Sequence, residues 1–569
     1  MNNDDIFYYQ RELANLNQTR EYFVKRFPKL APFLAFDSKD PDVERIIENL
    51  AILTSKIHQE IDQNIPQIAE SLLNIISPNY TNPLPSLCLQ EFTLKPDSKE
   101  NHLFIQKGSY VKSSPIEQVE CDFKTIYDVY LYPLEIEEVF INSERHYQTL
   151  TLRLTLNKPD IEISDIGLQC LQIYLGNDVY ASSNLLLFLN CYLDEARIVS
   201  CDTQEVFKLT SIENMGLNPN ESMLNYNDLG FESFALLREY FFMPEKFNFI
   251  KIKGLEAFDI KGRMIDLQFK FNKPLPKNCI IRKDLFALNI TPTINIFPKS
   301  AESIVNDHSR DGYRIFIDRM NLEAYEIIQI NQVKAHSNIT GRRILKNYKS
   351  FERFEFLAEG GDEFYSVHNK KNYNGETYKE ISFFSHYPHN EIISIDALCC
   401  NKNLPTKLKI GDIKYSKIDC IDTKNITIPS AMREYGGNSL WNLVSILSFN
   451  YQSILDITSF FSVIESYGFI NDKANRDSYD LLKNSIINMH SKPTYLVDGF
   501  ITKKGTLCII DIRDSNFYTL GEVYKLGLIL SKFFTSFVSI NSFCELEIKC
   551  LDSGEILYYP ANSGRKISL

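Results

Sequence analysis

The sequence has no excess of positive charge. Its 61 Lys and Arg residues are outnumbered by 73 Asp and Glu residues, which gives a formal net charge of −12. This balance argues against a nucleic-acid-binding protein and against broad binding to anionic lipid, because both need basic surfaces. Long uncharged apolar runs are also missing, since Asp456 interrupts the apolar window at 440–464 and Lys525 and Lys532 interrupt the one at 523–540. The sequence therefore predicts no transmembrane segment.

Targeting signals and paired cysteines are missing too. The first residues, MNNDDIFYYQREL, are acidic and lack the apolar core of a signal peptide, so we expect none. The twelve Cys residues include no CxxC pair. This scatter predicts reduced, buried thiols and a cytoplasmic protein.

Motifs for catalysis and metal binding are equally scarce. The sequence contains no GxSxG, Walker A, HExxH or GxGxxG pattern. His386 and His389, with Cys399 and Cys400 nearby, form the only metal-like group, and adjacent Cys residues do not readily ligate one tetrahedral zinc ion. We therefore expect no catalytic residue, no metal and no cofactor. The alternative is a cytosolic carbohydrate-processing enzyme on a β-sandwich scaffold, which a deep acidic cleft with paired carboxylates would favour.

Two apolar seams at helical spacing dominate residues 1–86. The first comprises Ile6, Tyr9, Leu13, Leu16, Phe23 and Phe27, with Arg20 at the missing position, and the second comprises Val43, Ile46, Leu50, Leu53 and Ile57. Such stripes need a facing surface, either inside the chain or on another subunit. Because the local sequence offers no second layer, we predict that this helical arm packs on partner subunits. The residues predicted to bind a partner are Ile6, Leu13, Leu16, Val43, Ile46, Leu50, Leu53 and Ile57.

The rest of the chain predicts β-rich domains followed by an α/β unit. Alternating apolar residues, as in 150–156 and 265–271, predict half-buried antiparallel strands, with a helical insertion at 183–193. Near the C-terminus, strand 506–512, helix 523–538 and strand 543–551 predict a crossover onto one sheet. The predicted fold class is therefore α+β and multidomain, with an N-terminal helical arm, β-rich middle domains and a C-terminal α/β unit. The predicted domains are 1–86, 87–275, 276–435 and 436–569.

A polar loop follows the strand predicted at 293–297, which Pro298 should end. The loop contains Glu302, Asp307, His308, Arg310 and Asp311. Acidic and His side chains so close together could form a catalytic or metal site. The interpretation we favour is a hydrogen-bonded brace in which Arg310 pairs with a carboxylate.

Four blocks of the sequence, in order along the chain, resemble one protein family. They are YYQREL with PDVERIIENLAIL, the loop pattern NxF…AExI…DH…YR(I)…D…YEI…V, the segment LWNLVSILSFNYQSIL, and GEVYKLGLILSKFFTSFVSINSFCEL. Together they resemble the TssF (ImpG/VasA) family of type VI secretion baseplate components. The family-motif loop corresponds to Glu302, Asp307, His308, Arg310, Tyr313 and Arg314. The sequence departs from the family pattern at two places. Ser309 separates His308 from Arg310, where the Arg is expected directly after the His, and the segment 359–389 has no recognised counterpart in the family pattern.

The resemblance implies a structural role without catalysis. A TssF-like chain is expected to form the baseplate wedge with TssG and TssK and with a second copy of itself. This wedge would surround the spike hub of VgrG and nucleate the contractile sheath with TssE. The expected location is cytoplasmic, at the inner face of the inner membrane, with only indirect links to the inner-membrane complex and no nucleic-acid partner.

Overall fold

A computed structural model gives the fold of the chain in two compact units. The described residues are 3–28, 42, 45–58, 82–144, 147–224, 232–339, 341–347, 363–371, 377–384, 390–433, 456–466, 473–498, 501–535, 537–539 and 541–564. The first unit comprises Met1–Ile75, Asp311–Arg314 and Asn347–His386, and the second comprises the remaining residues. Within the described ranges, no helix is long and apolar enough to cross a membrane.

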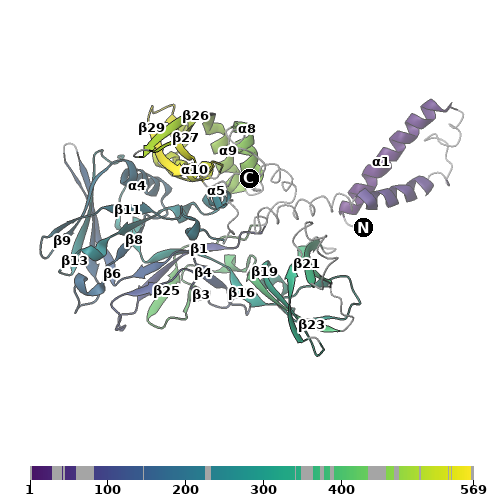
Figure 1. Ribbon diagram of the computed structural model, residues 1–569, viewed down its shortest axis with the longest axis horizontal. Helices are drawn as coiled ribbons and strands as arrows, with labels where there is room; N and C mark the ends of the chain where they lie inside the picture. Colours follow the sequence, from purple (N-terminus) through teal and green to yellow (C-terminus); the bar gives the residue numbers. More distant parts are fainter. Residues whose placement is uncertain are drawn as a thin grey trace. The chain divides into compact units, whose positions relative to one another are not determined.

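The first unit contains the helical arm and a small group of strands. Helix α1 (Asn3–Arg26) and a helix at residues 45–58 lie side by side (Figure 1). Both were predicted from their seams, and α1 ends two residues before Pro28, which cannot continue a helix. The strands are β18 (Tyr313–Arg314), β21 (Phe364–Lys371) and β22 (Thr377–Phe384), with β22 pairing antiparallel to both of the others.

A five-stranded antiparallel sheet in the second unit matches the period-two prediction. Its order is β10-β9-β13-β7-β6. Leu150, Leu152 and Leu154 on β7 are buried, as are Leu267 and Phe269 on β13. The bounds are β6 Leu134–Ser143, β7 Gln148–Leu156, β9 Leu193–Ser200, β10 Val206–Lys208 and β13 Met264–Phe271.

The predicted helical insertion is α4 (Val179–Cys191), which packs against the five-stranded sheet. Asp178 caps α4 by accepting hydrogen bonds from the backbone N–H groups of Tyr180 and Ala181. A second sheet has the order β11-β12-β8-β14. Its strands are β8 Cys170–Tyr174, β11 Ser211–Asn214, β12 Phe249–Lys253 and β14 Ala287–Leu288, and α5 (Glu232–Phe242) precedes β12.

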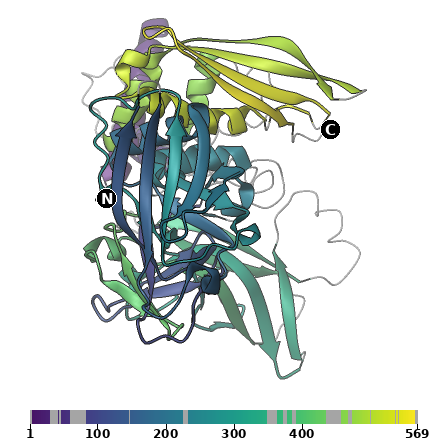
Figure 2. The same cartoon turned by 90° about the vertical axis from the view of Figure 1, so that its left-hand side faces the viewer.

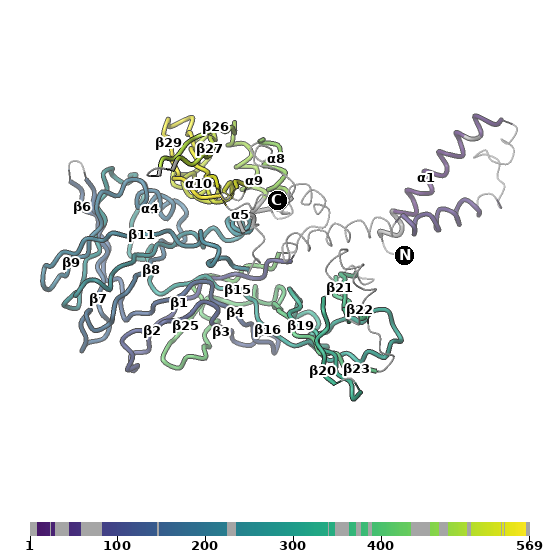
Figure 3. Tube along the Cα trace, in the orientation of Figure 1, coloured from purple at the N-terminus to yellow at the C-terminus, as the bar shows by residue number. Residues whose placement is uncertain are grey.

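A six-stranded sheet joins segments far apart in the sequence. Its order is β24-β3-β4-β15-β1-β25, and β1 lies between β15 and β25 (Figure 3). Strands from the predicted domains 87–275 and 276–435 therefore share one sheet, and the boundary between them stays a prediction. The bounds are β1 Leu87–Leu94, β3 Tyr110–Ser113, β4 Asp122–Thr125, β15 Ile290–Ile294, β24 Ile413–Ser416 and β25 Ile421–Asn425, beside the pair β2 (Leu103–Ile105) and β5 (Val129–Leu131).

The strand expected at 293–297 is divided in two. β15 ends at Ile294, and β16 (Phe297–Ser300) begins a different sheet by pairing with β23 (Glu391–Cys400). Pro298 lies inside β16, so the expectation that it ends the strand was wrong. Proline is tolerated there because β16 is an edge strand, where one side of the backbone makes no ladder bonds. β23 also pairs with β17 (Ile304–Asn306) and β19 (Glu326–Ser337), which continues to β20 (Gly341–Asn347).

The C-terminal residues form the predicted strand–helix–strand crossover. β27 (Ile501–Ile512) and β28 (Phe543–Cys550) are parallel, and α10 (Leu520–Thr535) connects them. The sheet order is β26-β27-β28-β29, with β26 (Ile486–Asp498) and β29 (Ile556–Ser563) at the edges. α8 (Ile457–Ser466) and α9 (Lys473–Ser485) precede the sheet, whereas the predicted helix start near Leu440 lies outside the described residues.

Candidate interaction surface

The apolar stripe on the helix at 45–58 faces away from α1. Leu50 and Leu53 keep 44% and 58% of their surface exposed, and Ile46 and Ile57 are also exposed. The residues of this helix that are covered are Ala51 and Ser55. At 100° per residue, the covered face and the stripe lie roughly 150° apart around the helix. The seam predicted from the sequence therefore exists, but α1 does not cover it.

The surface between the two arm helices is small and polar instead. Glu12 and Arg20 on α1 are buried, and Nδ1 of His58 lies 2.9 Å from Oε1 of Glu12. Ala51 is fully buried, which lets the helices approach closely. Sequence periodicity could not identify this contact, because small and polar residues give no apolar stripe. The buried Arg20 in the first seam was the available signal.

The other predicted seam positions differ in exposure, and Phe27, just after α1, keeps 46% of its surface exposed. Leu13 and Leu16 on α1 are half-buried. The side chains of Ile6 and Val43 lie outside the described residues. The exposed stripe at helical spacing comprises Ile46, Leu50, Leu53 and Ile57 on the helix at 45–58.

The family-motif loop forms a brace, with a different arginine from the one expected. Glu302 accepts a hydrogen bond from the backbone N–H of Arg319 at 2.8 Å, and its other oxygen lies 2.9 Å from Nε of Arg319. Among the described residues, no carboxylate lies within ion-pair distance of Arg310. The predicted pairing of Arg310 with a carboxylate was therefore wrong, and Arg319 forms the ion pair with Glu302 instead.

The remaining loop residues organise local turns. Asp307 Oδ1 accepts hydrogen bonds from the N–H and the hydroxyl of Ser309, and His308 has a φ of +57°. These contacts are typical of an Asx turn. Tyr313 and Arg314 belong to the first unit, where Tyr313 packs 6.0 Å from the ring of Phe383 and the guanidinium of Arg314 lies 4.7 Å from the ring centre of Tyr378.

The described residues contain no group of three His, Cys, Asp or Glu side chains that could hold a metal ion. His386 and His389 lie outside the described residues. Cys399 and Cys400 are buried, and burial raises the pKa of both thiols to about 12. Protonated thiols are poor metal ligands, because the thiolate is the ligating form.

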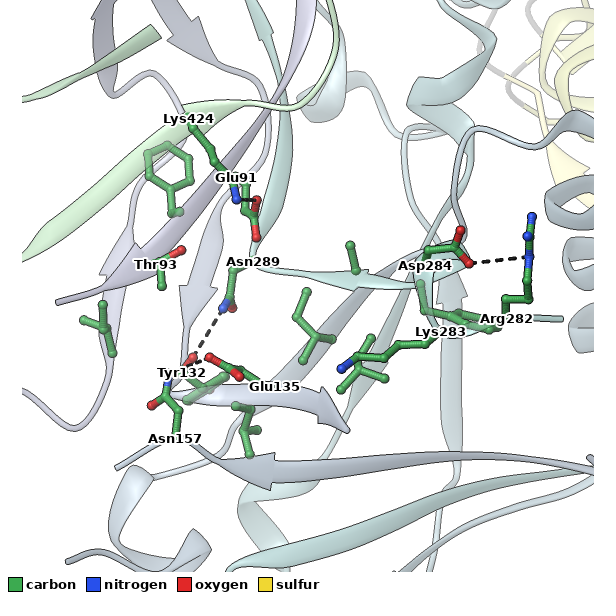
Figure 4. Close-up of a pocket in the computed structure, with 17 residues that line it drawn as sticks. Glu91, Thr93, Tyr132, Glu135, Asn157, Arg282, Lys283, Asp284, Asn289 and Lys424 are labelled. Atoms are coloured by element: carbon green, nitrogen blue, oxygen red, sulfur yellow. Dashed lines mark hydrogen bonds and ion pairs between the residues drawn. The ribbon is translucent and has the colours of Figure 1, made fainter. Parts of the chain in front are cut away.

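A cavity of about 760 Å³ opens between β1, β6 and β14 (Figure 4). Two of its acidic side chains are paired with cations, since Glu91 lies 3.0 Å from Nζ of Lys424 and Asp284 lies 3.7 Å from Nε of Arg282. The third, Glu135, accepts a hydrogen bond from Asn157 at 3.2 Å. The cavity therefore does not present the paired, free carboxylates that would favour a glycoside-processing enzyme.

Two lysine ammonium groups are buried, and the sequence pattern did not predict this. Lys246 is fully buried and forms an ion pair with Glu239, which also accepts hydrogen bonds from the hydroxyl of Ser222 and the N–H of Met223. Lys525 on α10 donates to the carbonyl of Pro244 and to Oδ1 of Asn248, both at 2.6 Å. The only sequence feature that points to this burial is the position of Lys525 inside an apolar helix. The two hydrogen bonds of Lys525 fix α10 to the segment before β12.

An exposed apolar helix face, a braced loop and a charge-paired cavity are together typical of a subunit that works by binding other proteins. The family model described as "Type VI secretion system, TssF" matches residues 1–566. The chain therefore belongs to the TssF family.

Individual relatives agree with this assignment. The type VI secretion system component TssF1 of Pseudomonas aeruginosa is 24% identical over an alignment that covers 100% of both chains. A chain in the cryo-electron microscopy structure of the type VI TssK-TssF-TssG baseplate subcomplex has a TM-score of 0.78 and 19% identity, covering 92% of this chain and 99% of that one. A chain in a structure of the type VI baseplate complex has a TM-score of 0.65 and 18% identity, covering 99% and 100%.

Proposed function

We propose that this chain is a structural subunit of a type VI secretion baseplate wedge. It assembles with TssG and TssK, as the solved complexes that contain similar chains do. The observation that carries the proposal is the exposed stripe of Ile46, Leu50, Leu53 and Ile57, on a helix whose covered face is small and polar. Four aliphatic side chains in a row on a solvent-facing helix need a partner to exclude water from them.

The stripe supplies part of the binding free energy of this assembly. Full burial of one exposed aliphatic side chain is worth about 1.5–3 kcal/mol, and the four keep 44–65% of their surface exposed, so burying the rest supplies roughly 3–6 kcal/mol. Loss of translational and rotational freedom costs about 4–15 kcal/mol on association. The two ranges overlap, so the arm needs further contacts from the same partner to hold a stable complex.

The wider role follows from membership of the family. The further partners proposed are a second copy of the chain, the sheath-initiating TssE and the spike protein VgrG, with indirect links to the inner-membrane complex. The chain acts in the cytoplasm at the inner face of the inner membrane, and it performs no chemical step. The pairing of charges inside the cavity supports this last point, because an acid–base catalyst needs carboxylates that are available to substrate.

Substitutions in the stripe test the proposal directly. Leu50→Asp or Leu53→Asp places a carboxylate in the predicted interface, and leaving it unpaired there costs several kcal/mol. We expect both variants to lose TssG and TssK in co-purification with the products of neighbouring genes. Lys56→Asp is the control, because Lys56 is exposed on the charged face of the same helix. Normal assembly of both Leu variants would show that the stripe is not the interface.

A further inference from the structure

Strands β26 and β27 run on beyond the sheet that they belong to (Figure 2). The parallel pairing of β27 with β28 begins at Gly505, opposite Phe543. On the far side of Gly505, residues 495–498 pair only with 501–504 among the described residues. We call this two-stranded segment the ribbon.

One face of the ribbon continues the covered face of the sheet. Side chains alternate along a strand, so Tyr495 and Val497 lie on the same face as Met489. Met489 is buried, and so is Cys508, which lies on the same face of β27. The sheet's covered face lies against α10, where Tyr559 packs beside Gly527. The core face therefore extends past its covering helix, and Tyr495 and Val497 remain 64% and 71% exposed.

The charge and the edges of the ribbon restrict what can cover this face. Lys504 lies directly opposite Tyr495 and adds a positive charge to the apolar patch, in a chain whose net charge is −12. Both edge strands of the sheet contain a proline, Pro493 in β26 and Pro560 in β29. Proline lacks the N–H that strand addition needs, so Pro493 and Pro560 hinder strand addition along the outer edges of the four-stranded sheet. Residues 501–504 of the ribbon contain no proline, so we assign the docking surface from its exposed apolar face and not from its edges.

We propose that the ribbon docks on another protein of the assembly, with Tyr495 and Val497 against an apolar surface and Lys504 beside a carboxylate of that protein. A two-stranded hairpin with apolar side chains in water is only marginally stable by itself, so a partner that covers this face also stabilises the ribbon. The inference rests on the proposed assembly role, and the ribbon is separate in sequence from the arm.

Site-specific photo-cross-linking tests the contact in the full-length chain. A photoreactive amino acid replaces Val497, and the chain is co-produced with the products of its neighbouring genes. We expect an adduct with a different polypeptide of the complex, on a peptide that contains Asp or Glu. Lys504→Glu should lower the adduct yield at least tenfold, whereas Lys504→Arg should retain it. The control replaces Lys492, which lies on the opposite face of β26, and should give no adduct.

The other outcomes would contradict the proposal that the ribbon docks on another protein of the assembly. An adduct with a second copy of this chain, an adduct with lipid, or no adduct in an assembled complex would overturn the proposal while leaving the assembly role intact. Failure of the natural chain to form any complex would overturn both. Tyr495→Ser with Val497→Ser should leave the thermal midpoint of the isolated chain unchanged, because both side chains are exposed.

Discussion

Lys525 places an ammonium group where the helix α10 meets the segment before β12. Its two acceptors, the carbonyl of Pro244 and Oδ1 of Asn248, satisfy hydrogen bonds but carry no full charge. Desolvation therefore lowers the pKa of Lys525 from 10.5 to about 8. Between these two pH values the unfolded chain binds more protons at this residue than the folded chain.

This difference predicts a rise of stability with pH. Relative to Lys525→Met, the free energy of unfolding of the natural chain should increase by about 3 kcal/mol between pH 8 and pH 10.5, at about 1.4 kcal/mol per pKa unit. Urea titrations of both proteins at several pH values measure this difference, in which tyrosine and cysteine ionisation cancels. A difference that stays constant over this range would mean that the lysine is solvated.

The buried pair of Lys246 and Glu239 predicts a second effect at the residue scale. Lys246→Met should lower the free energy of unfolding by about 3–5 kcal/mol, because it leaves a carboxylate buried without its cation. Adding Glu239→Gln should recover part of this loss, since the amide oxygen still accepts from the N–H of Met223. Thermal unfolding of the two variants provides the comparison, and equal midpoints would contradict the explanation.

At the scale of single elements, local patterns predicted strands and the crossover well. In 543–551, Cys544, Leu546, Ile548 and Cys550 alternate with charged residues, which predicts a strand with these four side chains inward. The strand is β28, and all four are buried. The order of elements predicted the parallel pairing of β27 and β28. The division at Ile294 and Phe297 was missed, because it depends on which distant strands each half pairs with. Local periodicity carries no information about such partners.

Local periodicity predicted the candidate site in the helical arm only in part. Its spacing predicted an apolar stripe, and the stripe is present at Ile46, Leu50, Leu53 and Ile57. The spacing could not show which face α1 covers, because Ala51 and Ser55 contribute no periodic signal. In the loop, Arg310 was favoured by its nearness in sequence, whereas folding brings Arg319 to Glu302.

Helix α10 gives a prediction at this scale through Gly527. A Cβ atom there would lie 2.1 Å from the hydroxyl oxygen of Tyr559, which is buried and stacks on Tyr524. Gly→Ala in a helix ordinarily stabilises by about 0.5–1 kcal/mol, but overpacking costs about 1–3 kcal/mol. Gly527→Ala should therefore lower the thermal midpoint. Tyr559→Phe in the same background should not recover the loss, because the ring carbon Cζ of residue 559 would still collide with the added Cβ and the hydrogen bond from the hydroxyl to the carbonyl of Tyr524 would be lost. An unchanged midpoint in Gly527→Ala would contradict the collision.

At the scale of the whole molecule, a structural subunit should tolerate polar changes better than cavities. Phe533→Ala empties a fully buried ring site and should cost about 3–5 kcal/mol, out of a usual domain stability of about 5–15 kcal/mol. We expect no assembled sheath in a secretion assay with sheath imaging. Asp307→Ala and His308→Ala should still give sheaths that contract.

The opposite result for the polar variants would change the interpretation of the chain. A His308→Ala protein that folds and assembles a full sheath but loses all activity would point to a chemical step. Phe297→Ala and Phe543→Ala extend the test to other buried rings, and both should behave like Phe533→Ala. The sequence predicts the same contrast for Trp441, whose truncation should prevent sheath assembly, and for His386 and His389, whose replacement by Ala should not. These three residues lie outside the described residues.

The six-stranded sheet also constrains the synthesis of the protein. β1 pairs with β25, whose first residue, Ile421, is made more than 300 residues after the first residue of β1. At a translation rate of about 5–20 residues per second, the ribosome needs roughly 15–65 s to supply this partner. During that interval the apolar side chains of β1 cannot enter their final sheet. We therefore expect nascent chains halted before residue 421 to bind chaperones that recognise exposed apolar segments, and to release them once translation passes Asn425.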